Sequence, residues 1–202
     1  MSSSTATQRQ HPITGRPSLA GATLVMVVGL GVLWLLEVID VAVPALKLDL
    51  WGISPRELDE LPQLLTAPLI HSGFDHLVAN SVPFFVLGLV ILLSGLRGFI
   101  TATLCSVIAS GMVVWLIAPA NSVTVGASGL VFGWLTFVLA RGFFTRRWSH
   151  LVLGVAAFVV YGGILWGVLP SAAEVSWQAH AGGAIGGLLA ARWLRPTPTV
   201  RT

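Results

Sequence analysis

Six long stretches of the chain contain no charged side chain, and they constrain its fold more than any other feature. They cover residues 19–36, 77–96, 98–118, 122–140, 151–169 and 175–191. A helix needs about 20 predominantly apolar residues to cross the hydrocarbon core of a bilayer. Backbone groups cannot stay unpaired in lipid, and none of the stretches shows the alternating polarity of a membrane β-strand. The sequence therefore predicts an all-α, polytopic membrane protein with six transmembrane helices.

The overall composition agrees with a chain that lies mainly in lipid. Only 9% of the residues are charged and 55% are hydrophobic, whereas soluble domains carry about 25% charged residues. Three regions are predicted: a disordered cytoplasmic tail over residues 1–18, a six-span membrane domain over 19–194, and a short basic cytoplasmic tail over 195–202. Cys105 is the single cysteine, so no intramolecular disulfide can form.

The distribution of charge predicts the orientation of the helices. Nine of the eleven basic residues fall on one side of a six-helix serpentine, and Lys47, Arg56 and all eight acidic residues fall on the other. By the positive-inside rule, both termini are cytoplasmic and the long first loop is outside. The net charge of +3 thus reflects topology in a lipid bilayer, and no nucleic-acid partner is expected.

Four polar residues occur inside or at the start of the apolar stretches, where burial is costly and needs a reason. They are His76, Asn80, Ser128 and His180. The second, fourth and sixth helices all run inward from the external side, and each carries its polar residues near its start. The sequence therefore predicts that the four side chains lie at one depth, just beneath the external surface.

Ser128 and His180 are candidates for a nucleophile and its base. Ser128 lies in Gly126-Ala127-Ser128-Gly129, and Gly183 and Gly187 share a helical face with His180. Such glycines can simply let helices pack closely, with Gly129 and Gly133 forming a GxxxG pair. The same packing could bring an imidazole within hydrogen-bond reach of the serine hydroxyl, which activates it. Apart from Asp75 and Glu174 near the rim, no acid that could orient the histidine is expected at this depth, so we interpret the pair as a dyad.

His76 and Asn80 are four residues apart, so their side chains share one face of a helix. Each could serve only an interhelical hydrogen bond. Together with the backbone N–H of Ser128, their N–H groups could instead stabilise the negative oxygen that develops during acyl transfer.

With these motifs, the chain resembles the rhomboid family of intramembrane serine proteases. The matching residues are His76 and Asn80 in the second span, Gly126 to Gly129 at the fourth, and His180 with Gly182 and Gly183 in the sixth. The resemblance covers all six spans. It implies a serine endopeptidase with a Ser128–His180 dyad, an oxyanion hole of His76, Asn80 and Ser128, and no cofactor or metal.

The resemblance also implies supporting residues, substrates and a location. Gly126, Gly129, Phe132 and Gly183 would support the site, with the Phe132 ring packed on the histidine where many relatives have tyrosine. The first loop lacks the Trp-Arg pair of some bacterial members. The substrates would be single-pass transmembrane proteins, cleaved at the extracytoplasmic side of the cell membrane, and the oligomeric state is not predicted.

Three other classes of function are compatible with parts of the pattern. A rhomboid-like protein without activity could bind transmembrane helices. A zinc enzyme could use His71, Asp75, His76 and His180, although there is no HExxH motif. A small transporter would be expected to show internal repeats or charged residues at the membrane midplane, which are missing from the sequence. In the fifth span, Phe158, Tyr161 and Trp166 are either a lateral gate for substrate or an ordinary interfacial belt.

Overall fold

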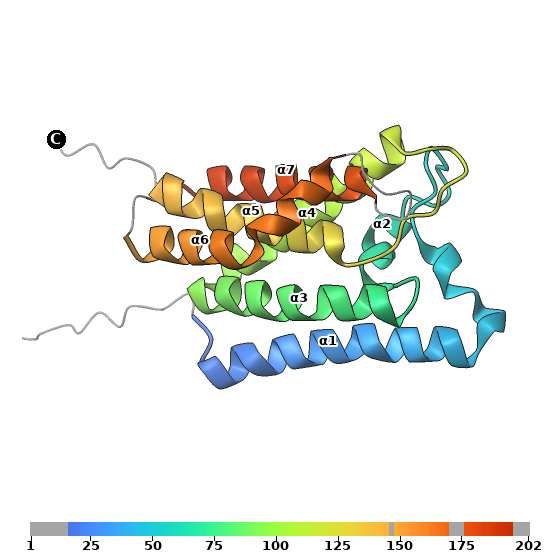
Figure 1. Cartoon of the computed structure of the whole chain (residues 1–202), viewed down its shortest axis with the longest axis horizontal. Helices are drawn as coiled ribbons and strands as arrows, with labels where there is room; N and C mark the ends of the chain where they lie inside the picture. Colours follow the sequence, from blue (N-terminus) through green and yellow to red (C-terminus); the bar gives the residue numbers. More distant parts are fainter. Residues whose placement is uncertain (1–15, 146–147, 170–175, 196–202) are drawn as a thin grey trace, which may run out of the picture.

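A computed structural model describes residues 16–145, 148–169 and 176–195. Every regular element in these ranges is a helix, and the only strand-like pairing is an isolated bridge between Ile53 and Thr124. Six longer helices form the bundle in Figure 1: α1 (Leu19–Ala42), α3 (Phe74–Ser94), α4 (Leu96–Ile117), α5 (Ser128–Thr145), α6 (Trp148–Tyr161) and α7 (Trp177–Trp193). The predicted all-α fold class is confirmed.

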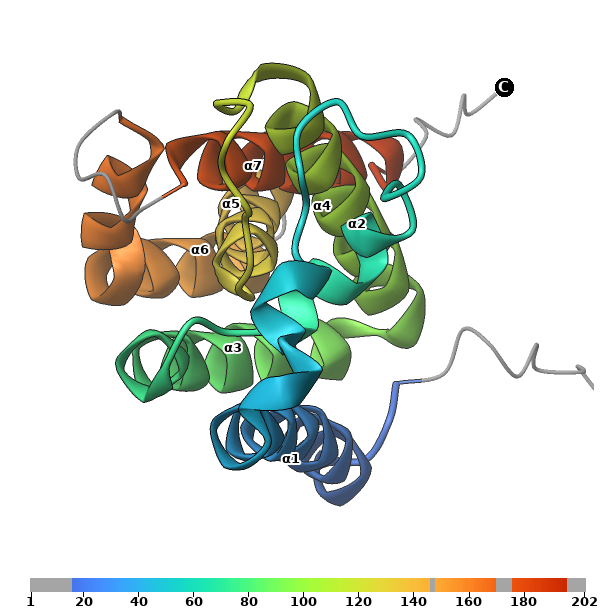
Figure 2. The same cartoon turned by 90° about the vertical axis from the view of Figure 1, so that its right-hand side faces the viewer.

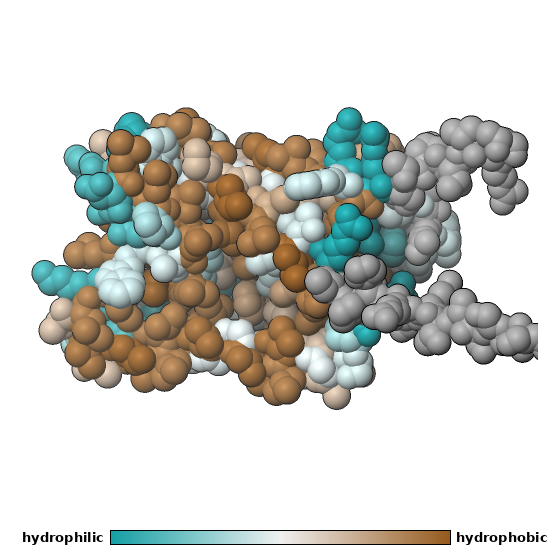
Figure 3. Space-filling view, turned by 180° about the vertical axis from the view of Figure 1, so that it is seen from behind, coloured by the Kyte–Doolittle hydropathy of each residue, from teal (hydrophilic) through white to brown (hydrophobic). Residues whose placement is uncertain are grey.

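Length and hydropathy identify the chain as a polytopic membrane protein. Helices α1, α3, α4 and α5 are long and apolar enough to cross a bilayer. Helix α6 has 14 residues and continues as the 3-10 helix η4 (Gly162–Val168), and the glycine-rich α7 has 17 residues. Hydrophobic side chains dominate the face in Figure 3, between two ends where hydrophilic side chains gather. The start of α1 and the end of α7 lie at the same end of the bundle (Figure 1).

Three helix boundaries differ from those expected from the sequence. Helix α1 runs on to Ala42 and includes Glu37, which is buried, and Asp40, whose carboxylate accepts the Leu48 N–H at 2.9 Å. The fourth long helix in the bundle, α5, begins at Ser128 and not at residue 122, because the preceding segment pairs with the first loop through Thr124. The fifth span is α-helical only to Tyr161.

Glycines bring α4, α5 and α7 into backbone contact at the centre of the bundle. A Cβ added to Gly183 would overlap the Gly129 carbonyl, and one added to Gly187 would overlap the Gly133 carbonyl. Two hydroxyls add cross-helix bonds, from Ser110 to the Ala179 carbonyl and from Thr136 to the Ala184 carbonyl, both at 2.9 Å. The close approach predicted from the glycine spacing is confirmed.

The first loop folds over the end of the bundle where α3, α5 and α7 begin (Figure 2). It contains η1 (Pro44–Leu46), η2 (Leu48–Trp51), α2 (Gln63–Thr66) and η3 (Ala67–Leu69). The Arg56 guanidinium donates to the carbonyls of Leu116 and Ala118, and the Trp115 indole donates to the Glu57 carbonyl. These bonds fix the loop against the end of α4 and the segment that leads to α5.

Helix α1 lies at the edge of the bundle, against α3 (Figures 1 and 2). Met26 of α1 packs against Gly88 of α3, and the Trp34 indole donates to the Ser81 hydroxyl at 3.1 Å. The core of the described structure therefore consists mainly of the other helices, and α1 covers one side of it.

Candidate active site

Ser128 is the first residue of α5 and is half-buried. The turn before it depends on Gly126, whose φ of +113° is a conformation that residues with a Cβ rarely adopt. A Cβ at this position would also meet the His76 ring, 2.8 Å from Nε2. Glycine therefore lets the backbone turn sharply into the helix while the imidazole of α3 lies directly against it.

The start of α5 offers backbone donors beside the Ser128 hydroxyl. Val131 is the first residue of the helix whose N–H reaches back to an i−4 carbonyl, that of Ala127, at 2.9 Å. The N–H groups of the first residues of a helix have no partner within it, and they form the positive end of the helix dipole. Those of Ser128 and Gly129 are therefore suited to stabilise a negative oxygen formed next to the serine.

His180 lies in the first turn of α7 and is 7% exposed. Its Nδ1 is 2.8 Å from the carbonyl oxygen of Gly167 in η4. Because a carbonyl can only accept, we assign the ring proton to Nδ1, which leaves Nε2 as the basic nitrogen of the neutral imidazole. The ring also stacks on Phe132, with centroids 3.9 Å apart and planes 8° from parallel. Two contacts thus fix the position and the tautomer of His180.

The stack and the glycine contacts bring His180 to the start of α5, where Ser128 lies. Ser128 and Phe132 are one turn apart on the same face of α5, and the Phe132 ring stacks on that of His180. The backbone of Gly129 touches that of Gly183, one turn beyond His180 on α7. Ser128 and His180, both among the described residues, form no hydrogen bond with each other, and the His180 Nδ1 faces Gly167. Catalytic hydrogen bonds in apo active sites are often long and tighten only with substrate.

His76 and Asn80 lie on α3, on the side that faces this pair. His76 Nδ1 is 3.3 Å from the Ser72 hydroxyl, and its imidazole is near enough to those of His71 and His180 to interact electrostatically. Asn80 is 5% exposed, and its amide nitrogen donates to the His76 carbonyl at 2.9 Å. An amide nitrogen carries two hydrogens, so this bond leaves one more to donate.

The group that orients His180 could not be identified from the sequence. Two acids could have oriented the His180 ring. Asp75 is exposed at the start of α3, and Glu174 lies outside the described residues. The Gly167 carbonyl occupies the position that a carboxylate has in a triad. A backbone carbonyl is present at every residue, so no sequence signal marks this one.

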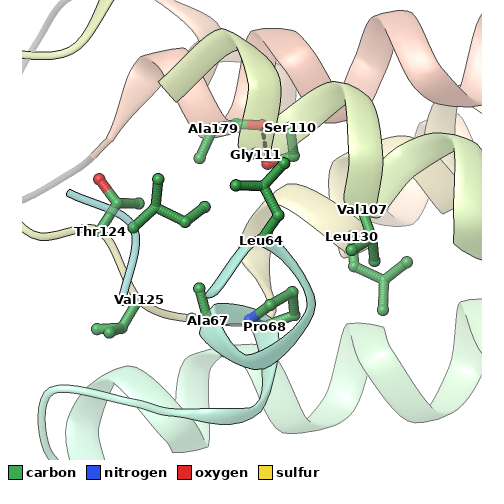
Figure 4. A pocket seen from close by; sticks show the side chains of 12 residues that line it. Leu64, Ala67, Pro68, Val107, Ser110, Gly111, Thr124, Val125, Leu130 and Ala179 are labelled. Carbon is green, nitrogen blue, oxygen red and sulfur yellow. Dashed lines mark hydrogen bonds between the residues drawn. The ribbon is translucent and has the colours of Figure 1, made fainter. Parts of the chain in front are cut away.

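Two further groups of residues do not form a site of their own. Within the described ranges, no three His, Cys, Asp or Glu side chains converge to hold a metal ion. A small pocket beside the Gly126 turn has a volume of about 10 Å³ and is lined mainly by apolar side chains, with the Ser110 hydroxyl bonded to the Ala179 carbonyl at one edge (Figure 4). Ser128, His76 and His180 are not among its lining residues.

The aromatic residues of the fifth span are only partly described. Phe158 is 55% exposed on the outer side of α6, and Tyr161 is half-buried against the core. The side chain of Trp166 lies outside the described residues.

Comparison with known proteins gives one family and several relatives. The model of the Rhomboid domain family matches residues 58–197. An uncharacterized protein of Mycobacterium tuberculosis (strain H37Rv) is 41% identical over 188 residues, which cover 88% of this chain and 77% of the relative. An uncharacterized protein of Mycobacterium leprae is 39% identical over 193 residues, 91% of this chain and 74% of the relative. A chloroplastic rhomboid-like protein of Arabidopsis thaliana is 38% identical over 72 residues, 35% of this chain and 26% of the relative.

Proposed function

The chain belongs to the rhomboid family, and on this premise we propose that it is an intramembrane serine protease. It would hydrolyse peptide bonds in or next to the transmembrane helices of single-pass membrane proteins. The observation that carries the proposal is the environment of His180: Gly167 and Phe132 hold its ring beside the start of α5, with Nε2 left as the base. A histidine needed only for packing would not require a fixed tautomer next to a serine.

The proposed reaction uses groups of this chain alone. The Ser128 hydroxyl attacks the substrate carbonyl and gives its proton to His180 Nε2. The N–H groups of Ser128, Asn80 and His76 stabilise the negative oxygen of the tetrahedral intermediate. The protonated His180 then donates its proton to the leaving amine, which departs and leaves an acyl-enzyme on Ser128. A water molecule, deprotonated by His180, hydrolyses that ester and restores the serine.

We place the reaction at the extracytoplasmic side of the cell membrane. The starts of α3, α5 and α7 share the end of the bundle that the first loop covers (Figure 2). That loop carries Asp49, Glu57, Asp59 and Glu60, whereas the arginines of the described chain, apart from Arg56, belong to the segments at the other end. The positive-inside rule then supports an external site, where water can reach the acyl-enzyme.

A fluorescent fluorophosphonate tests the proposal, because it reacts only with an activated serine. Purified wild-type protein in proteoliposomes should be labelled, and Ser128→Ala and His180→Ala should not be. Ser122→Ala is the matched control, since this serine lies six residues before Ser128, in the segment that leads to α5, where its hydroxyl donates to the Pro119 carbonyl. Equal labelling of the wild type and Ser128→Ala would refute the assignment of the nucleophile.

The same samples separate a protease from an inactive member of the family that binds transmembrane helices. An inactive protein would bind a single-pass transmembrane peptide in the proteoliposomes without being labelled and without cleaving the peptide. The proposed protease should be labelled and should release a shortened peptide that mass spectrometry detects.

A further inference from the structure

His71 is a buried histidine at the candidate active site that the proposed reaction does not use. It lies between η3 and α3 and is only 1% exposed. An imidazole has two nitrogens that favour hydrogen bonds, so its complete burial is costly unless they are satisfied. The hydrogen-bond partners of this ring therefore indicate which neighbouring groups it holds in place.

One nitrogen of His71 bonds to the residue just before the nucleophile. The backbone N–H of Ala127 donates to His71 Nε2 at 3.4 Å, across 56 positions of sequence. The ring also meets His76 edge-on, with centroids 5.1 Å apart. Since Nε2 accepts, it carries no proton, and we assign the proton of the neutral ring to Nδ1.

The surroundings keep His71 neutral. Burial, and to a lesser extent the nearby His76, lowers the pKa of His71 from its ordinary 6.5 to about 4, and the Leu69 carbonyl offsets only a part of this shift. Among the described residues, Nδ1 has no partner in hydrogen-bond geometry, so the Leu69 carbonyl acts on it as a nearby dipole. At neutral pH the lone pair of Nε2 is therefore available to the Ala127 N–H.

Residues 67–76 hold the turn that leads into α5 at three points. The Gly126 N–H donates to the Ala67 carbonyl at 2.9 Å, the Ala127 N–H donates to His71, and the His76 ring lies against Gly126. Two consecutive N–H groups are thus fixed immediately before the N–H of Ser128. A rotation about the bonds of Ala127 would turn the Ser128 N–H away from the oxygen that it stabilises.

We propose that His71 is a positioning residue of the protease site: by accepting the Ala127 N–H, it fixes the direction in which the Ser128 N–H and hydroxyl point. This role rests on the proposed function, because it has a kinetic consequence only if Ser128 is the nucleophile. His71 touches neither the substrate nor the reacting atoms. It acts through the backbone of Ala127.

Two substitutions separate positioning from simple filling of space. His71→Phe keeps an aromatic ring of similar volume and removes the acceptor. His71→Gln restores an acceptor, because the side-chain carbonyl can reach the place of Nε2. His150→Gln is the matched control, since this histidine lies at the other end of the bundle, in the first turn of α6 beside Thr145 at the end of α5.

The kinetics of fluorophosphonate labelling give the first readout. Relative to the wild type, His71→Phe should lower the rate at saturating probe by about tenfold, as expected for a reacting group that is slightly misplaced. The half-saturating probe concentration should change less than twofold, and His71→Gln should recover most of the rate. Thermal unfolding of each variant measures the folded fraction, to which the rates are normalised. A normalised rate for His71→Phe equal to that of the wild type, or no recovery in His71→Gln, would overturn the proposal.

The second readout does not depend on activity. NMR of protein labelled with 15N-histidine, with His71→Gln used to assign the signal, should show Nδ1 protonated and Nε2 unprotonated from pH 7 down to pH 5. A proton on Nε2 at pH 7 would refute the contact with Ala127, whether or not the protein is a protease. Conversely, a wild-type protein that is not labelled at all, but shows this tautomer, would refute the proposed function and with it the kinetic role, while the contact itself would stand.

Discussion

Replacing Gly183 by alanine tests the contact that holds the candidate dyad together. Gly183 lies one turn after His180 on α7, and its Cα faces the backbone of Gly129, the residue after Ser128. An added Cβ would overlap the Gly129 carbonyl oxygen and lie 2.7 Å from the carbonyl carbon and 3.2 Å from the Cα. All three atoms belong to the backbone of a helix, so no side chain can rotate away to make room.

The expected loss of stability follows from two opposing contributions. Alanine favours a helix over glycine by about 0.5–1 kcal/mol. Overpacking a well-filled interior costs about 1–3 kcal/mol, and a clash between two backbones belongs at the upper end of that range. We therefore expect Gly183→Ala to reduce the free energy of unfolding by about 2 kcal/mol. Separation of α7 from α5 also moves His180 away from Ser128, and a misplacement of about 1 Å costs about 100-fold in rate.

The assay compares thermal unfolding and fluorophosphonate labelling of Gly183→Ala with those of Gly31→Ala. Gly31 also lies within a helix, α1, but a Cβ there has no neighbour within 4 Å. This control should keep its labelling rate and gain stability from the helix propensity of alanine. Wild-type stability together with a wild-type labelling rate in Gly183→Ala would refute the inference that backbone contact between α5 and α7 sets the geometry of the dyad.

Three further predictions concern the residues around the dyad. Gly126→Ala should abolish labelling, because φ at this residue is +113° and a Cβ would strike the His76 ring; labelling above a tenth of the wild-type rate would contradict this. Phe132→Tyr should keep the stack on His180 and the labelling rate, whereas Phe132→Ala should lower the rate, and equal rates in these two variants would show that the stack does not matter. Acid should destabilise the fold through His71: with a folded pKa of about 4 and an ordinary value of 6.5, the unfolded chain binds the proton that the folded chain excludes. This contribution to the free energy of unfolding is complete above pH 6.5, is lost as the pH falls toward 4, and amounts to at most about 3 kcal/mol. The free energy of unfolding should therefore decrease less steeply with falling pH in His71→Gln than in the wild type. Identical slopes would contradict the assignment.

The helices could be predicted because their cause is local. A run of apolar residues in lipid must satisfy its own backbone, and this requirement depends on no distant partner. The run over residues 77–96 accordingly contains most of α3, and that over 98–118 most of α4. The start of α5 depends instead on residues far away in the sequence: Ile53 pairs with Thr124, and Ala67 accepts the Gly126 N–H. No local pattern records such contacts, so the predicted start was six residues too early.

The residues of the candidate site could also be identified from the sequence, because their signal is local. Polar side chains in apolar runs are costly, and those of His76, Asn80, Ser128 and His180 belong to helices that begin at the same end of the bundle (Figure 1). Their catalytic roles stay predictions until the labelling experiment is done. His71 gave a weaker signal, because it lies outside the spans in a loop where histidine is unremarkable. Its bond with the Ala127 N–H joins positions 56 residues apart, which no local pattern records.

The Gly167 carbonyl shows how the ring of His180 can be oriented by a neutral group. In a soluble triad a buried carboxylate orients the histidine and stabilises its positive form. Near the surface of a membrane protein, burying that charge would cost several kcal/mol before it helped the reaction. A neutral carbonyl fixes the same Nδ1 proton without a charge to desolvate, and the ring of Phe132 contributes the alignment that one hydrogen bond cannot provide. In the proposed reaction the contacts of His180 among the described residues are to the neutral Gly167 carbonyl and the Phe132 ring, so most of the electrostatic stabilisation would come from the donors around the oxyanion. If the proposed function is right, the orientation of the Ser128 N–H, and of the Ala127 peptide whose N–H donates to His71, should therefore matter more than in a protease with a complete triad.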